Sequence, residues 1–196
     1  MRSVTMAIAR SMSIIGHPFL VVPSAVLAVL LHRDAASTAA VAVPVCGVCV
    51  GAFAFSLWQV HRGRWQHIDA SVTTERSSLN LFLATVLLIG AAVGFYQKAE
   101  PGLSIGLLLS GLLIVLAMMV SPWAKLSLHA AFAAFSVLLL WSLTVWHLVL
   151  AGAAAAGICW SRVVLGRHTI GEVLAGSGLG ALFGACFWFM LTRNGR

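Results

Sequence analysis

Long apolar segments separated by short polar breaks make up most of this chain, and they limit it to a helical membrane architecture. Most of them approach the roughly 20 residues that an α-helix needs to cross a bilayer. A chain of 196 residues that is 61% hydrophobic and 9% charged is typical of an integral membrane protein. The apolar segments cover residues 14–31, 39–60, 80–97, 103–120, 127–147, 149–164 and 169–191.

These segments predict an all-α, polytopic transmembrane helical bundle with six to seven spans. The count depends on segment 149–164, which is short and forms either a tilted span or half of a tight hairpin. Residues 1–12 read as an interfacial helix, and His17 as an interfacial side chain at the start of a span. We expect a single membrane domain over residues 1–196, in a multi-pass protein of the plasma or inner membrane. A stripe of small residues for close helix packing follows at Gly176, Gly180 and Gly184.

Polar residues gather in three patches, at 61–78, 125–129 and 161–168, each followed by an apolar segment. Two spans separate each patch from the next, so all three emerge on the same side of the membrane. Ionisable groups at membrane level are costly and mark functional sites by default. The sequence therefore predicts an active site at one membrane interface. The unusual residues in and beside the patches are His67, Asp69, Glu75, Arg76, Lys125, Ser127, His129, Arg162, Arg167, His168 and Glu172.

His168 and Glu172 are the most informative pair. A helix that starts near residue 168 places positions 168 and 172 on one face, where the carboxylate reaches an imidazole nitrogen. A histidine oriented in this way, beside Arg162 and Arg167, suits covalent phosphoryl transfer, because the imidazole attacks phosphorus while guanidinium groups hold the oxygens. The alternative is an interfacial pair that only solvates a helix end.

The net charge of +7 indicates either contact with anionic headgroups of the lipid bilayer or an anionic substrate. The basic residues are scattered between the spans, so nothing indicates a nucleic-acid partner. Cys46 and Cys49 form a C-G-V-C motif inside an apolar segment with no other ligand type beside them, which favours buried thiols. The predicted chemistry requires no cofactor and no metal.

Three signatures of the type 2 phosphatidic acid phosphatase superfamily resemble segments of this chain. The signature S-R-x5-H-x3-D is similar to residues 161–172. Here five residues separate Ser161-Arg162 from His168, and three more separate His168 from Glu172. The signature P-S-G-H resembles Leu126-Ser127-Leu128-His129. The signature K-x6-R-P resembles the segment in which six residues separate Asp69 from Arg76-Ser77. The order and separations also match, and the resemblance covers about residues 60–190.

The resemblance implies a catalytic role for three residues. His168 would be the nucleophile that forms a phosphohistidine, and Glu172 would orient and stabilise it. His129 would protonate the leaving oxygen and then activate water. The residues implied to hold the phosphate oxygens are Arg76, Arg162 and Ser127.

This chain departs from the family pattern at several positions. Asp69 stands where the family has lysine, and Lys125 or Arg167 would supply the missing cation. Leu126 and Leu128 replace the proline and glycine of the second signature, and a glutamate replaces the final aspartate.

The predicted function is hydrolysis of a lipid phosphate, such as phosphatidate, phosphatidylglycerol phosphate or a polyprenyl diphosphate. Two alternatives stay open at this point. One is a magnesium-dependent prenyl diphosphate enzyme that uses Asp69 and Glu75 as metal ligands. The other is a non-catalytic lipid-binding or transport protein on the same fold.

Overall fold

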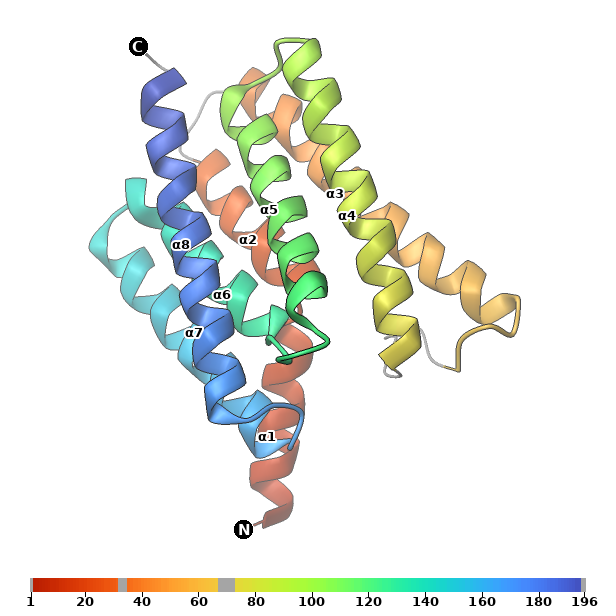
Figure 1. Cartoon of the computed structure of the whole chain (residues 1–196). Helices are drawn as coiled ribbons and strands as arrows, with labels where there is room; N and C mark the ends of the chain where they lie inside the picture. Colours follow the sequence, from red (N-terminus) through yellow and green to blue (C-terminus); the bar gives the residue numbers. More distant parts are fainter. Residues whose placement is uncertain (1, 32–34, 67–72, 195–196) are drawn as a thin grey trace. The chain divides into compact units, whose positions relative to one another are not determined.

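The computed structural model describes residues 2–31, 35–66 and 73–194, and these form helices and turns (Figure 1). They divide into two compact units, residues 1–34 with 120–196 and residues 35–119. The single membrane domain expected from the sequence stays a prediction. The first unit holds α1 (Arg2–Ile15), α2 (Pro18–Leu30), α6 (Leu128–Leu139), the 3-10 turn η1 (Leu140–Ser142), α7 (Val145–Val164) and α8 (Ile170–Asn194). The second holds α3 (Ala35–His61), α4 (Thr73–Tyr96) and nearly all of α5 (Pro101–Val120).

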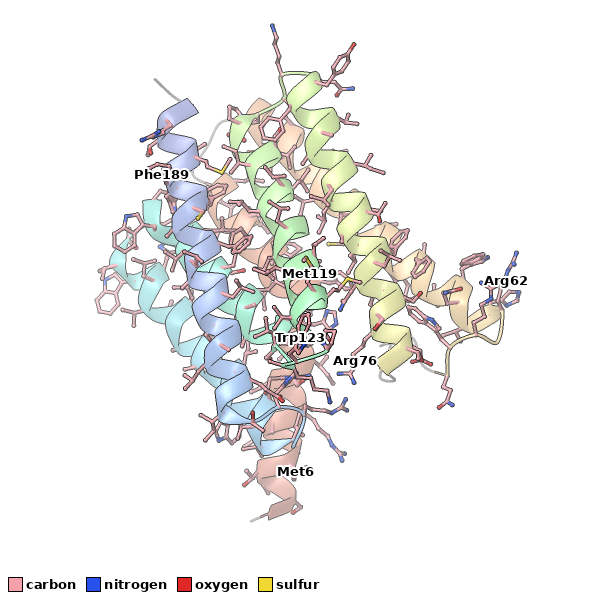
Figure 2. The ribbon with its side chains drawn as sticks, viewed as in Figure 1. Met6, Arg62, Arg76, Met119, Trp123 and Phe189 are labelled. Carbon is pink, nitrogen blue, oxygen red and sulfur yellow. The ribbon has the colours of Figure 1, made fainter. Side chains whose placement is uncertain are left out.

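The all-α membrane fold predicted from the sequence is confirmed. Within the described residues, α3, α4, α5, α7 and α8 are each long and apolar enough to cross a membrane, and the bent pair α1–α2 makes a sixth candidate span. Large apolar side chains lie on outer surfaces, as a hydrocarbon solvent permits. Phe189 on α8 projects outward and carries Arg193 over its ring at 4.5 Å from the centroid (Figure 2). The chain is therefore an integral membrane protein.

Helices α1 and α2 meet at a bend of 59°. Pro18 occupies the first turn of α2, and a proline forces the residue before it out of the helical region. His17 accordingly has extended backbone angles (φ −65°, ψ 137°) and acts as the N-cap of α2. The apolar segment 14–31 is thus divided between two helices, and the bend carries His17 toward α6.

Helix α6 is shorter than the 127–147 span that the sequence predicts, and this part of the prediction is wrong. Its 12 residues extend roughly 18 Å, well below the thickness of the hydrocarbon core. The indole Nε1–H of Trp188 on α8 donates to the carbonyl of Leu138 (2.6 Å), which satisfies a helix-end acceptor, and the chain then tightens into η1. α6 is packed by α2, α7 and α8, and most of its side chains are buried.

The glycine stripe of α8 packs closely against another helix, as the sequence predicts, and that helix is α6. A Cβ at Gly176 would lie 2.5 Å from the carbonyl oxygen of Ser127, and one at Gly180 would clash with the backbone of Ala131. A Cβ at Gly184 would clash with the side chain of Leu138. The two backbones therefore approach closely along the length of α6, which fixes the start of α8 beside the start of α6.

The second unit is held by apolar and aromatic contacts between its own helices. Phe55 of α3 stacks on Phe82 of α4, with ring centroids 4.2 Å apart and the rings almost parallel. Near the start of α4, Glu75 is buried and its carboxylate accepts the backbone N–H of Gln66 (2.7 Å). Arg76 extends from the same turn (Figure 2).

Candidate functional site

The connection between α7 and α8 is built by two successive capping motifs. Gly166 has a positive φ of 64°, and its N–H bonds to the carbonyl of Val163 (3.0 Å). The N–H groups of Arg167 and His168 both bond to the carbonyl of Arg162, at 3.0 and 3.2 Å. The first two of these three bonds make a Schellman motif, which ends α7 and turns the chain back on its last turn. The motif brings His168 beside Arg162.

Thr169 and Glu172 then form a capping box at the start of α8. The Glu172 N–H donates to Thr169 Oγ1 (3.2 Å), and the Thr169 N–H donates to Glu172 Oε2 (3.2 Å). The same Oε2 lies 2.9 Å from Nδ1 of His168. Because an ionised carboxylate only accepts, the imidazole proton sits on Nδ1. The contact predicted from the 168/172 spacing is present, and the capping box explains why the carboxylate is held in place.

His168 is the more buried member of this pair. Its side chain is 8% exposed, whereas that of Glu172 is 24% exposed. The ring is held through Nδ1 by the carboxylate, and Nε2 is its second nitrogen. An imidazole whose ring is partly shielded and held by a carboxylate through one nitrogen is an arrangement that nucleophilic catalysis uses.

Ser127 and His129 lie at the start of α6. Ser127 is fully buried, and its Oγ accepts the N–H of Ala130 (3.4 Å) as the N-cap of α6. Its own N–H bonds to the carbonyl of Glu172 (3.3 Å), which ties the starts of α6 and α8 together. Capping uses the hydroxyl oxygen as an acceptor, so it is compatible with donation of the hydroxyl proton to a phosphate oxygen.

His129 lies within electrostatic range of Arg162, His17, His168 and Arg167. It belongs to α6, which is not among the helices long enough to span a membrane. Burial, and next the positive charge of Arg162, lowers the pKa of His129 well below its usual range. The His129 ring is therefore neutral at pH 7 until an anion offsets the positive charges around it.

Arg162 is the buried cation of the site. It is 7% exposed and lies in the last turn of α7. Its Nη1 donates to Ser13 Oγ of α1 (2.7 Å). Lys125 and Arg167 are exposed at the edge. Lys125 acts electrostatically on Glu172, and Arg167 on His129, so both lie near the other polar residues of the site.

Most of the predicted site residues belong to one compact unit. The first unit contains all of them from Lys125 to Glu172. Arg76 belongs to the second unit, and its part in phosphate binding stays a prediction. Asp69 lies outside the described residues, so the acidic pair with Glu75 is not tested. Among the residues that the structure describes, there is no group of three or more His, Cys, Asp or Glu side chains arranged to hold a metal ion.

Two residues at the α1–α2 bend were missed by the sequence reasoning, Ser13 and His17. The His17 ring packs edge-on against His129, with centroids 5.1 Å apart, so its interpretation as an interfacial side chain was incomplete. The only sequence signal is the His17-Pro18 step, which predicts a break but not its neighbours.

Comparison of the chain with protein-family models, with curated proteins and with solved structures gave no match.

Proposed function

We propose that the protein is a membrane-embedded lipid phosphatase or diphosphatase that works through a phosphohistidine intermediate. The observation that carries the proposal is the His168–Glu172 pair, with Nδ1 held at 2.9 Å and both His129 and Arg162 nearby. A helix-end pair that only met solvent would not need a buried guanidinium and a second, half-buried imidazole beside it.

In the first step, Nε2 of His168 attacks phosphorus, and the bond between phosphorus and the lipid oxygen breaks. His129 gives its proton to the leaving oxygen. The imidazole of His168 becomes a positively charged phosphoimidazolium, and the Glu172 carboxylate stabilises that charge through Nδ1–H. This step requires protonated His129, which the charge of the bound phosphate favours.

In the second step, His129, now neutral, takes a proton from water as the water oxygen attacks phosphorus. The bond between Nε2 and phosphorus breaks, which releases inorganic phosphate and returns neutral His168. Charge accumulates on the phosphate oxygens in both steps, and fixed cationic donors stabilise it. Arg162 is the donor held inside the site, while Arg167 and Lys125 act from its edge.

The substrate class follows from the surroundings of the site. A chain made largely of apolar helices solvates a long acyl or prenyl chain, so the substrate is a lipid phosphomonoester or diphosphate. Phosphatidate, phosphatidylglycerol phosphate and polyprenyl diphosphate all meet this description. We place the activity in the plasma or inner membrane.

The test is phosphate release by purified protein in lipid nanodiscs, with each of the three lipid phosphates and with excess EDTA. We expect turnover in EDTA, an inactive His168→Ala variant, and acid-labile phosphate trapped on the wild type alone. Strict magnesium dependence would instead support the Asp69/Glu75 hypothesis. Tight lipid-phosphate binding without any turnover would support a non-catalytic binding protein.

A further inference from the structure

The α1–α2 bend reaches the site through two polar side chains, Ser13 and His17, which lie far from the three signatures in sequence. We propose that this bend is part of the phosphate-binding site, in which Ser13 positions the guanidinium of Arg162 and His17 positions the ring of His129. The inference rests on the proposed phosphatase function, because it assigns these two residues to the same site.

Ser13 acts on a long side chain with several rotatable bonds. An arginine has several rotatable bonds, so its catalytic value depends on groups that hold the guanidinium plane in place. Ser13 Oγ accepts from Nη1 of Arg162 at 2.7 Å, across 149 residues of sequence. The bond uses one N–H donor of the guanidinium group and leaves its charge intact, so it orients Arg162 without neutralising it.

His17 is itself held firmly. Its Nδ1 accepts the N–H of Phe19 (3.3 Å), so the neutral ring carries its proton on Nε2. The ring also lies against Phe19, with centroids 4.8 Å apart. A ring fixed at its own helix end supplies a rigid wall for the His129 ring, which it meets edge-on at 5.1 Å. His17 thereby restricts the direction in which His129 presents its proton.

The end of α1 and the bend pack against α7. A Cβ at Gly16 would clash with Ile158 and lie 2.7 Å from the carbonyl oxygen of Met12. A Cβ at Gly157 would clash with the methyl group of Met12. Gly16 therefore lies in close contact with Ile158 of α7, and Gly157 of α7 with the end of the Met12 side chain. These contacts hold the end of α1, which carries Ser13, against α7.

The variants for Ser13 are Ser13→Ala and Ser13→Thr, with Ser11→Ala as the matched control. Ser11 lies on the same helix and is exposed. We expect Ser13→Ala to raise KM for a lipid phosphate and weaken orthovanadate binding by roughly tenfold, as loss of a hydrogen bond to a charged group does. Ser13→Thr should recover most of this loss, and Ser11→Ala should match the wild type. The Ser13→Ala change should have no further effect in an Arg162→Ala background.

The variant for His17 is His17→Asn, because asparagine keeps the N-cap of α2 while it removes the imidazole. We expect kcat to fall roughly tenfold with KM and melting temperature little changed, and we expect no further loss in a His129→Ala background. Full activity of His17→Asn would overturn the role of His17. Full activity and full vanadate affinity of Ser13→Ala would overturn the role of Ser13.

Orthovanadate binding, measured by thermal shift, separates this inference from the proposed function. If the wild type binds vanadate but hydrolyses no lipid phosphate, the phosphatase proposal fails. In that case, weaker vanadate binding by Ser13→Ala still supports the bend as part of the site, and unchanged binding overturns it. If the wild type neither hydrolyses lipid phosphates nor binds vanadate, both proposals are wrong.

Discussion

Substitution of Glu172 separates its two roles, because one carboxylate oxygen serves both the capping box and His168. Glutamine also completes a capping box, so Glu172→Gln should keep the start of α8 and change the melting temperature little. It removes the negative charge that stabilises the phosphoimidazolium in the proposed mechanism. Alanine removes both functions and should also destabilise the fold, by about 0.5–2 kcal/mol as loss of a cap does.

The rate effect of Glu172→Gln can be worked from the contact. Unit charges about 4 Å apart interact by about 4 kcal/mol at the effective dielectric constant of a protein surface. Because Glu172 is 24% exposed, we discount this to about 2–4 kcal/mol. At 1.36 kcal/mol per tenfold, the rate of phosphate release should fall by roughly 30- to 1,000-fold.

The assay is phosphate release at saturating lipid phosphate, alongside thermal unfolding of each variant. Glu172→Asp restores the residue of the resembled family and should keep substantial activity. A wild-type rate for Glu172→Gln would refute the reasoning. So would a loss of activity that simply tracks loss of stability across the alanine, glutamine and aspartate variants.

The remaining predictions concern the other charged groups of the site. His129→Ala should slow turnover by about 10²–10⁴-fold while lipid binding persists, and an unaltered rate would remove His129 from the mechanism. Lys125→Ala should weaken phosphate binding, and Asp69→Lys in that background should restore some activity; wild-type behaviour of Lys125→Ala would make Arg167 the better candidate. Burial and positive neighbours lower the pKa of His129, and a bound phosphate raises it again, so vanadate binding near pH 7 should take up a proton. Calorimetry in buffers of different ionisation enthalpy should detect this uptake in the wild type and not in His129→Ala.

The sequence was sufficient for the membrane fold and for the His168–Glu172 contact, because both depend on local rules. Span positions follow from runs of apolar residues, and the His168–Glu172 contact follows from helical spacing. The glycine stripe of α8 likewise predicts a close helix neighbour, although not that the neighbour is α6.

The features that the sequence did not reveal depend on contacts between distant segments. The end of α6 is set in part by Trp188, 50 residues after the carbonyl that it satisfies. Ser13 contacts Arg162 across 149 residues of sequence, where the end of α1 packs against α7. No periodicity in residues 1–18 encodes that position. The capping box at Thr169 is a local pattern that could have been read from the sequence, and it was overlooked.

The candidate site is built almost entirely from helix ends, and this bears on the charge of the ligand that the proposed function requires. His17 caps the N-terminus of α2, Ser127 caps that of α6, and Thr169 with Glu172 caps that of α8. The contacts of His17 with His129, and of Ser127 with Glu172, bring these three N-termini together. Each N-terminus carries a partial positive charge, which adds to that of Arg162. Glu172 offsets part of this positive potential, and the remainder would favour an anion such as the phosphate of the proposed substrate.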